Sequence, residues 1–370
     1  MIRKAIFWAH LAAGIITGLV VLTLCLTGAL LAFERQIVNI AERDARALPP
    51  SNSAEQLPPA VLLANAAKIK SGKVSNIEWL ANPRSPVRVV YGDRSVLLLN
   101  GWTGEVLGPG ANSLRGFFHF ITNLHVELTF PEAGKWIVDV SNVTFLFLLL
   151  SGLWLWWPRH WRWKALRSSI AFRWSLRGKA RDWNWHNALG FWFLTPLLVI
   201  VLTGLVLSYK GVNEWWRDFA PKHFLAAKVT PVVPPAPQSG NLPGWKGLME
   251  TVTAQFPGWQ SVMIGNPTPE NTQKVVSLMV FLGPIGQRTL VHTISIDPAT
   301  NTIVKTGGWE SDEAGLRARA IARFGHTGEI LGPWGQLLAL LACLAGIVLV
   351  YTGFALSWRR FPRRGTTAPT

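Results

Sequence analysis

The chain has 370 residues, of which 49% are hydrophobic and 20 are tryptophan, and its formal net charge is +16. Together with a positive mean hydropathy, this composition is not that of a soluble enzyme and directs attention to membrane spans. The two cysteines, Cys25 and Cys343, are too few for a disulfide framework or a thiolate metal site.

Four apolar runs predict four transmembrane helices. Residues 5–33, 187–209 and 330–358 contain no Asp, Glu, Lys or Arg, and residues 136–157 contain only Asp139, near one end. Each run reaches the roughly 20 residues that cross a bilayer. The first run is far longer than the roughly 7–15-residue core of a signal peptide, so we expect an uncleaved anchor.

The predicted elements follow one another in two similar series. In chain order they are transmembrane helix 1–33, outer domain 34–133 with a histidine segment at its end, transmembrane helix 134–157, basic cytoplasmic loop 158–185, transmembrane helix 186–209, second outer domain 210–331, transmembrane helix 332–358 and cytoplasmic tail 359–370.

The distribution of basic residues predicts the topology. The N-terminus, the 158–185 loop and the C-terminal tail together hold fourteen Lys and Arg residues and one acidic residue, Asp182, whereas each long loop is nearly balanced. Because basic residues collect on the cytoplasmic side of a membrane, we expect both termini and the 158–185 loop there, and both long loops outside. The charge then reflects orientation in a lipid bilayer rather than a nucleic-acid-binding surface.

Each long loop is predicted to fold as a small α+β domain. Residues 57–69 and 244–256 have apolar helical patterns, and the segments after them alternate as strands do. Tight turns at residues 100–104 and 297–301 connect two such strands in each loop, which is the chemistry of β-hairpins.

The chain repeats itself, and four histidines recur at matched positions. His10 and His186 are each followed by glycine at +4 and +18, and His125 and His326 are each followed by glycine at +9 and +27, tryptophan at +32 and arginine at +34. These matches predict a tandem duplication whose halves are parallel repeats about a pseudo-two-fold axis along the membrane normal. The first pair then shares the cytoplasmic depth, and the second pair shares the outer depth.

Two facing histidine pairs indicate axial ligation of two b-type haems, one near each membrane face. Gly14 and Gly190, one turn after His10 and His186, would leave room for a flat macrocycle. Zinc fits less well, because neither layer has Cys, Asp or Glu at matching positions. Two simpler explanations stay open: a histidine at a helix end can hydrogen-bond at the headgroup level, and glycines can serve helix packing.

Several long motifs resemble the PepSY-associated transmembrane family, whose members include inner-membrane ferrisiderophore reductases. The motifs are LRGFFHFITNLHVELTF, LLLSGLWLWWPR, DWNWHNALGFW and FGHTGEILGPWG, and the resemblance covers nearly the whole chain. It implies two PepSY-like periplasmic domains, a place in the bacterial inner membrane, and haem ligation by His10, His125, His186 and His326. Some relatives carry an appended flavin reductase domain; here we expect a separate donor, either a cytoplasmic flavoprotein reductase or quinol.

The expected function is that of a dihaem oxidoreductase that reduces a ferric siderophore or another ferric chelate from Fe(III) to Fe(II) in the periplasm. A one-electron reduction needs no protein acid or base, so no catalytic side chain is assigned. The rival is a haem-free membrane protein whose PepSY-like domains bind or inhibit peptidases or sense the state of the envelope. A transporter is a weaker third possibility, since the four predicted spans offer no broken helix and no buried charge pair as a substrate site.

The other histidines fail the repeat test. His119, six residues before His125, is the alternative outer ligand, and with Arg115 it is a candidate contact to substrate. The rest are expected at the membrane interface (His160) and at the surface or in turns (His223 and His292).

Overall fold

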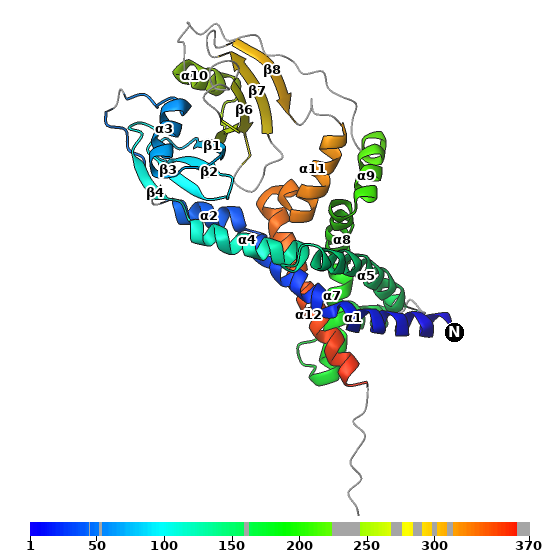
Figure 1. Cartoon of the computed structure of the whole chain (residues 1–370). Helices are drawn as coiled ribbons and strands as arrows, with labels where there is room; N and C mark the ends of the chain where they lie inside the picture. The colour runs from blue at the N-terminus through cyan, green and yellow to red at the C-terminus, as the bar shows by residue number, and fades with distance from the viewer. Residues whose placement is uncertain are drawn as a thin grey trace, which may run out of the picture. The chain divides into compact units, whose positions relative to one another are not determined.

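The computed structural model describes residues 1–43, 45–51, 54–158, 163–223, 245–267, 276–283, 291–297, 302–308 and 314–360. The chain forms two compact units, and each unit takes segments from both halves of the sequence (Figure 1). The helical unit consists of Met1–Ala32, Phe120–Trp216 and Ala322–Thr370, and the sheet unit consists of Phe33–His119 and Arg217–Ile321.

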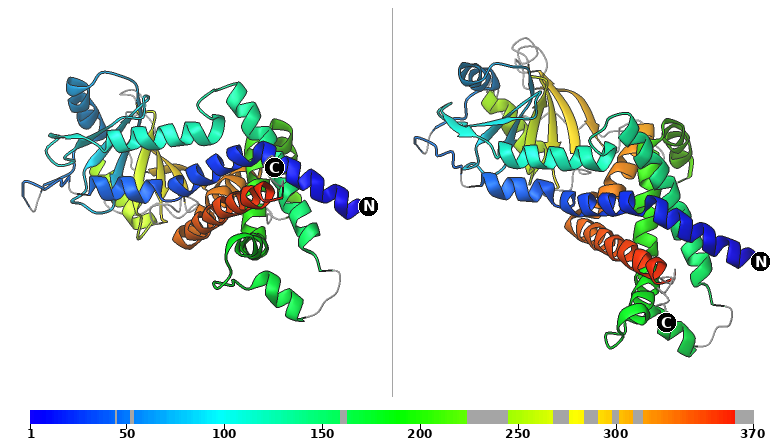
Figure 2. Two further views of the ribbon diagram at one scale, coloured as in Figure 1. Left: turned by 90° about the horizontal axis from the view of Figure 1, so that it is seen from below. Right: turned by 60° about the horizontal axis from the view of Figure 1, so that its bottom comes forward.

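Five helices form most of the described part of the helical unit, and all but α7 are strongly apolar. They are α1 (Ile2–Leu31), α5 (Ala133–Trp156), α7 (Gly178–Trp192), α8 (Leu194–Ser208) and α12 (Gly332–Trp358). Helix α1 packs against α12 and α5, α7 packs against α12, and α8 packs against α5; Figure 2 shows α12 in red beside α1 in blue. A short helix, α6 (Trp163–Ile170), packs on α7.

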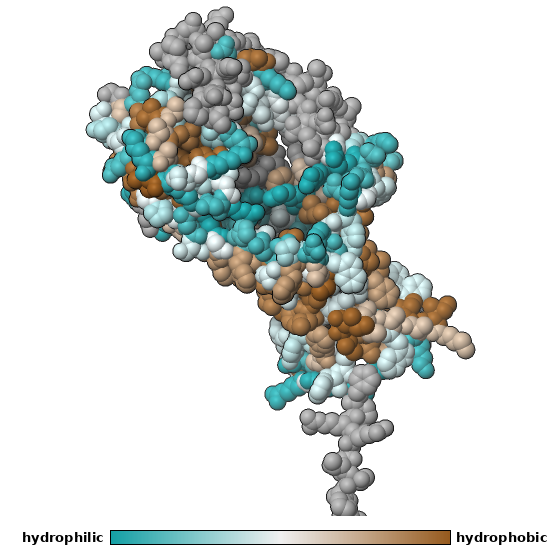
Figure 3. Space-filling model, in the orientation of Figure 1, coloured by the Kyte–Doolittle hydropathy of each residue, from teal (hydrophilic) through white to brown (hydrophobic). Residues whose placement is uncertain are grey.

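The outward faces of these helices are apolar, as a membrane requires. On the face seen in Figure 3, hydrophobic residues gather over the helical unit, and side chains such as Ile16, Leu19 and Trp136 are mostly exposed. Among the described residues, three helices are long and apolar enough to cross a membrane, and the bent pair α7 and α8 makes a fourth if it is counted as one span.

The third span differs from the single helix predicted for residues 186–209. Helices α7 and α8 meet at Phe193 with a bend of 65°. Pro196 explains the break, because proline has no backbone N–H and its ring clashes with the carbonyl four residues earlier, here that of Trp192.

The two outer histidines lie on helices of their own, which precede α5 and α12. His125 is on α4 (Asn112–Glu127) and His326 is on α11 (Ala314–Thr327). A Cβ atom added to Gly134 would collide with the Glu127 carbonyl. At the matching position, a Cβ atom added to Gly335 would collide with the Gly328 carbonyl. Gly328 is the residue just before the 3-10 turn η1 (Glu329–Leu331). The repeated glycine nine residues after each histidine therefore allows a tight turn between two helices.

In the described part of the chain, eight strands form one antiparallel sheet in the order β4-β3-β2-β1-β5-β6-β7-β8. The strands are β1 (Val74–Leu80), β2 (Val87–Tyr91), β3 (Val96–Leu99), β4 (Val106–Pro109), β5 (Ser261–Gly265), β6 (Val276–Phe281), β7 (Val291–Asp297) and β8 (Thr302–Gly308). We expected two separate domains, but β1 pairs with β5, with Glu78 opposite Met263. This pairing removes two exposed strand edges, which would otherwise carry unpaired backbone groups.

The predicted outer-loop helices pack together on one face of this sheet. They are α3 (Pro59–Ile69) and α10 (Trp245–Gln255), and they share a core with alternate strand residues. Trp79 of β1 lies 4.5 Å from Trp245 between ring centroids. Since strand side chains alternate between faces, Glu78 lies on the opposite face, with Arg88 of β2.

One of the two expected turns is described. In the 100–104 turn, the Gly104 N–H donates to the Asn100 carbonyl at 2.8 Å, and Gly104 has φ +73°, which glycine adopts without strain. In the 297–301 turn, residues 298–301 lie outside the described residues, although the flanking strands pair with Asp297 opposite Thr302. The remaining helices are α2 (Glu34–Glu42) and α9 (Lys210–His223).

Candidate functional site

The helical unit brings the four repeated histidines together in two pairs. His125 of α4 faces His326 of α11, with ring centroids 6.2 Å apart and ring planes inclined by 62°. His10 of α1 and His186 of α7 lie near one another, on two helices that both pack against α12. Each pair takes one histidine from each half of the chain, as the sequence matches predict.

The separation of the outer pair suits two axial ligands of one metal ion. Two imidazole nitrogens on opposite sides of a metal, each at about 2 Å, place the ring centres at about 6 Å from each other. His125 and His326 meet this requirement at 6.2 Å. Within the described residues, no group of three or more His, Cys, Asp or Glu side chains could hold a metal ion. Two imidazoles are too few to complete a tetrahedral zinc site, whereas a haem iron needs only two ligands from the protein.

Each of the four histidines is oriented by a hydroxyl group from a neighbouring helix. The contacts at Nδ1 are His10 with Ser151 (2.8 Å), His125 with Thr27 (2.8 Å), His186 with Thr352 (3.0 Å) and His326 with Thr203 (3.3 Å). Each hydroxyl also donates to the carbonyl four residues earlier on its own helix.

This arrangement selects one tautomer of the imidazole. Because the hydroxyl hydrogen is already donated to a backbone carbonyl, the hydroxyl oxygen accepts from Nδ1–H. The Ile200 carbonyl, which can only accept, also lies 2.8 Å from Nδ1 of His326. With its proton on Nδ1, each imidazole keeps the lone pair of Nε2 for a metal, as metal-bound histidines commonly do.

Both outer imidazoles are also kept neutral by their surroundings. Burial lowers the pKa of His125 to about 4, and the nearby His326 lowers it as well. Burial also lowers the pKa of His326. A neutral imidazole is the form that binds a metal, so these two side chains need not lose a proton first.

A glycine follows each hydroxyl residue and lies beside the edge of the histidine ring, where it has no side chain to crowd the ring. An added Cβ would lie near the Cε1 atom of the histidine in every case: Gly28 at 3.5 Å from His125, Gly152 at 3.5 Å from His10, Gly204 at 3.3 Å from His326 and Gly353 at 3.7 Å from His186. We call these dipeptides, Thr27-Gly28, Ser151-Gly152, Thr203-Gly204 and Thr352-Gly353, the histidine seats.

Sequence reasoning found the seat glycines but missed the hydroxyl residues. The matches at +18 and +27 are the four seat glycines. The residue before each of them is threonine or serine, and this signal was present in the sequence. Gly28 was matched through its spacing from His10. The sequence did not reveal that it lies beside the ring of His125, which belongs to the other pair.

The glycines one turn after the inner histidines lie in less crowded positions. A Cβ on Gly14 would meet only Leu148 at 3.8 Å, and a Cβ on Gly190 would meet only Leu349 at 3.9 Å. By contrast, a Cβ on Gly18 would lie 2.6 Å from Phe354. Helix packing therefore explains Gly18, but it does not require glycine at 14 or 190.

The two histidine layers are separated by most of the thickness of a bilayer. His10 and Thr27, which contacts the outer His125, are 17 residues apart on α1. At about 1.5 Å per residue, this places the layers about 25 Å apart along the helix, compared with about 30 Å for the hydrocarbon core of a membrane.

The other predicted contacts are placed differently. On α4, it is the ring of His125 and not that of His119 that lies opposite His326. Arg115 forms an ion pair with Glu42 at 2.8 Å in the sheet unit. His160 lies outside the described residues. His223 ends α9, and His292 lies on β7 with its ring 5.1 Å from that of Phe256.

Comparison with known proteins identifies the family. A family model described as the PepSY-associated TM region matches residues 7–360, which include all four paired histidines. No curated protein matches the chain. The match spans nearly the whole sequence, and the structure has the long apolar helices that the family description requires. The chain is therefore a membrane protein and belongs to the PepSY-associated transmembrane family.

Proposed function

We propose that the chain is a dihaem electron-transfer protein that reduces ferric chelates at the outer face of the bacterial inner membrane. The observation that supports it best is the opposition of His125 and His326 at 6.2 Å, with Nδ1 of both rings engaged by hydrogen bonds. When bound, haem would supply one-electron redox chemistry, which needs no acid or base from the protein.

The chain's own residues hold and orient the cofactors in this proposal. His125 and His326 would hold the outer haem b, and His10 and His186 would hold the inner haem b. The histidine seats fix the ring orientations, and Gly14 and Gly190 leave space beside the inner ligands. The matched positions of ligands and seats support a tandem duplication of a two-helix unit.

The direction of electron flow rests on the charge distribution. Basic residues favour cytoplasmic termini, which puts the sheet unit in the periplasm. A cytoplasmic flavoprotein reductase or quinol is the donor, and a ferric siderophore or another ferric chelate is the acceptor. Each electron converts one Fe(III) to Fe(II), which oxygen-rich chelators bind less tightly than the harder Fe(III).

A reduced-minus-oxidised absorbance spectrum of the purified protein is the direct test of the cofactors. We expect two b-type haems per chain, loss of the outer one in His125→Ala or His326→Ala, and loss of the inner one in His10→Ala or His186→Ala. His119→Ala is the matched control on α4 and should retain both. Two haems in any ligand variant would refute the assignment, and a colourless wild-type protein would favour the haem-free, peptidase-binding rival.

The acceptor is tested with dithionite-reduced protein in nanodiscs. Ferric hydroxamates and ferric citrate are added, and haem reoxidation is followed together with capture of Fe(II) by a ferrous-specific dye. We expect both signals to rise together, faster than reoxidation in buffer. If haem is present but no ferric chelate accelerates its reoxidation, the protein serves another acceptor. A reporter fused after Arg360 should be cytoplasmic; the reverse orientation would contradict the proposed electron path.

A further inference from the structure

The sheet unit contains a pocket that the electron-transfer proposal does not use. Its volume is about 530 Å³, within the range of small-molecule sites. The lining is strongly basic, with six arginines and three glutamates, Glu34, Glu42 and Glu78. The arginines are Arg35, Arg43, Arg46, Arg84, Arg88 and Arg115.

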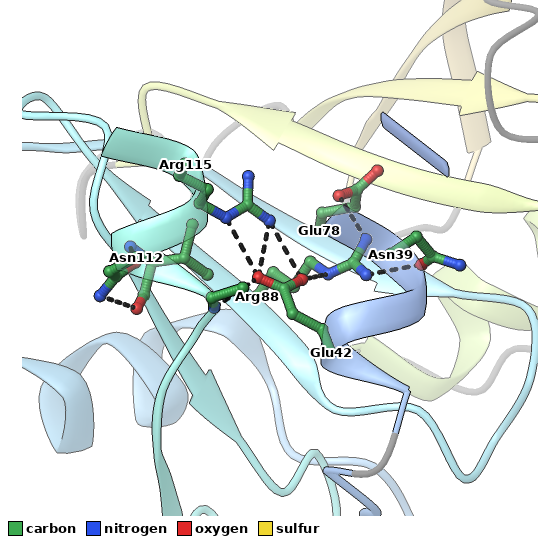
Figure 4. Close-up of polar contacts among 8 residues, drawn as sticks. Asn39, Glu42, Glu78, Arg88, Asn112 and Arg115 are labelled. Carbon is green, nitrogen blue, oxygen red and sulfur yellow. Dashed lines mark hydrogen bonds and ion pairs between the residues drawn. The ribbon is translucent and has the colours of Figure 1, made fainter. Parts of the chain in front are cut away.

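A buried ion-pair network forms one wall of this pocket (Figure 4). Glu42, only 4% exposed, accepts hydrogen bonds from Arg115 at 2.8 and 3.0 Å and pairs with Nε of Arg88 at 3.0 Å. Arg88 also donates to Asn39 at 2.7 Å and lies 3.5 Å from Glu78. Two arginines and two glutamates thus balance one another, and Arg115 is committed to this wall rather than available for a substrate.

The remaining charges of the pocket are mostly positive. Outside the network, the lining has four arginines and one glutamate, Glu34. Arg46 and Arg84 are exposed, and in the part of the chain that the structure describes neither forms an ion pair. Guanidinium groups present planar forks of N–H donors that match the oxygens of phosphates and carboxylates.

We propose that this pocket binds an anion with phosphate or carboxylate oxygens, held chiefly by Arg46 and Arg84. The network of Glu42, Arg88 and Arg115 gives the site a rigid wall, so the site is organised before the ligand arrives. Helix α2, which supplies Glu34 and Arg35, begins three residues after the end of the apolar helix α1. An anionic lipid headgroup and a soluble anion are therefore two sources of the same chemistry. The site requires no haem.

The test uses the full-length protein in nanodiscs. One arm uses phosphatidylcholine alone and measures binding of inorganic phosphate and of citrate by calorimetry. The other arm adds phosphatidylglycerol and counts retained lipid by native mass spectrometry. We expect at least one anion to bind and the double variant Arg46→Gln/Arg84→Gln to weaken it by roughly tenfold or more, because two charge-assisted contacts are lost. Both side chains are exposed, so folding should be retained.

Two further variants make the interpretation specific. Arg319→Gln removes the same charge from an exposed position of α11 that does not line the pocket, and it should bind as the wild type does. Glu34→Gln removes a negative charge from the lining and should tighten binding. If the double variant loses only phosphatidylglycerol retention, the site binds a lipid headgroup. If it loses only the binding of phosphate or citrate, the site binds a soluble anion. The proposal is overturned if the wild type binds none of these anions, or if the double variant binds as well as the wild type or Arg319→Gln.

Discussion

Replacing Thr27 by valine removes a hydrogen bond from His125 and leaves the shape of the side chain almost unchanged. The Thr27 hydroxyl, on a residue only 2% exposed, lies 2.8 Å from Nδ1 of His125. Loss of such a partner behind a metal ligand typically lowers metal affinity by about 10–100-fold. The Leu24 carbonyl also accepts a hydrogen bond from His125. We therefore expect the lower end of this range, about tenfold or about 1.4 kcal/mol, for the outer haem.

The equivalent change in the second half should have a smaller effect. Thr203 lies 3.3 Å from Nδ1 of His326, whereas the Ile200 carbonyl lies at 2.8 Å and would remain. Thr203→Val should therefore weaken the outer haem by less than about threefold, because the stronger of the two hydrogen bonds is kept. The two seats of one haem are thus predicted to differ in strength.

Transfer of haem to an excess of a haem-scavenging protein measures these differences, with absorbance as the signal. Thr17→Val is the matched control, because Thr17 is a buried threonine of the same helix whose hydroxyl donates to the Ala13 carbonyl at 2.9 Å. It should retain haem as the wild type does. The reasoning would be refuted if Thr27→Val matched Thr17→Val, or if Thr27→Val released the inner haem first.

Four other substitutions test the packing of both units. Gly204→Ala should lower outer haem content more than Gly353→Ala lowers inner haem content, because the added methyl would lie 3.3 Å rather than 3.7 Å from the histidine ring; the absorbance spectra of both variants check this. Asp182→Asn should lower the thermal unfolding midpoint in detergent, at a cost of about 2–4 kcal/mol, because a fully buried carboxylate that pairs with two arginines is lost. Glu42→Gln should cost about 3–5 kcal/mol in the same assay for the same reason.

Specific results would contradict each of these expectations. Equal haem loss in the two glycine variants would mean that the closer approach at Gly204 does not decide haem retention. Glu55→Gln is the comparison for Glu42→Gln, since Glu55 pairs with Lys246 at 2.6 Å but is largely exposed, and it should cost less than about 1 kcal/mol. If Glu42→Gln or Asp182→Asn were as mild as this change, the buried networks would not contribute to stability as inferred.

Local patterns in the sequence predicted the helices and strands, but they did not predict which strands pair with one another. The alternating segments expected after residues 57–69 do form strands, of which the first is β1. The joining of two expected domains through β1 and β5 was not foreseen, because strand pairing between distant segments leaves no local trace. The bend at Phe193 did have a local signal in Pro196, which a hydropathy count over the span does not register.

The candidate site was also predictable only in part, because some of its contacts join segments that are distant in the sequence. Repeated offsets revealed which histidines belong together, because a duplicated half must place equivalent side chains at equivalent depths. They did not reveal what lies behind each ring. That contact joins residues far apart in the chain, such as Thr27 and His125, which are separated by 98 positions. The seat on α1 meets its histidine on α4 only in the folded chain.

The contacts that orient each histidine lie within one half of the chain, whereas the histidine pairs combine the two halves. Within the first half, His10 rests on Ser151-Gly152 and His125 rests on Thr27-Gly28; within the second half, His186 and His326 rest on the two remaining seats. Each half therefore orients its own two imidazoles, but each facing pair needs one imidazole from each half. The sheet follows the same rule, since each half supplies four adjacent strands and β1 meets β5 at the centre. One half alone would present correctly oriented rings without partners, so in the proposed duplication it is the second copy that completes both proposed haem sites.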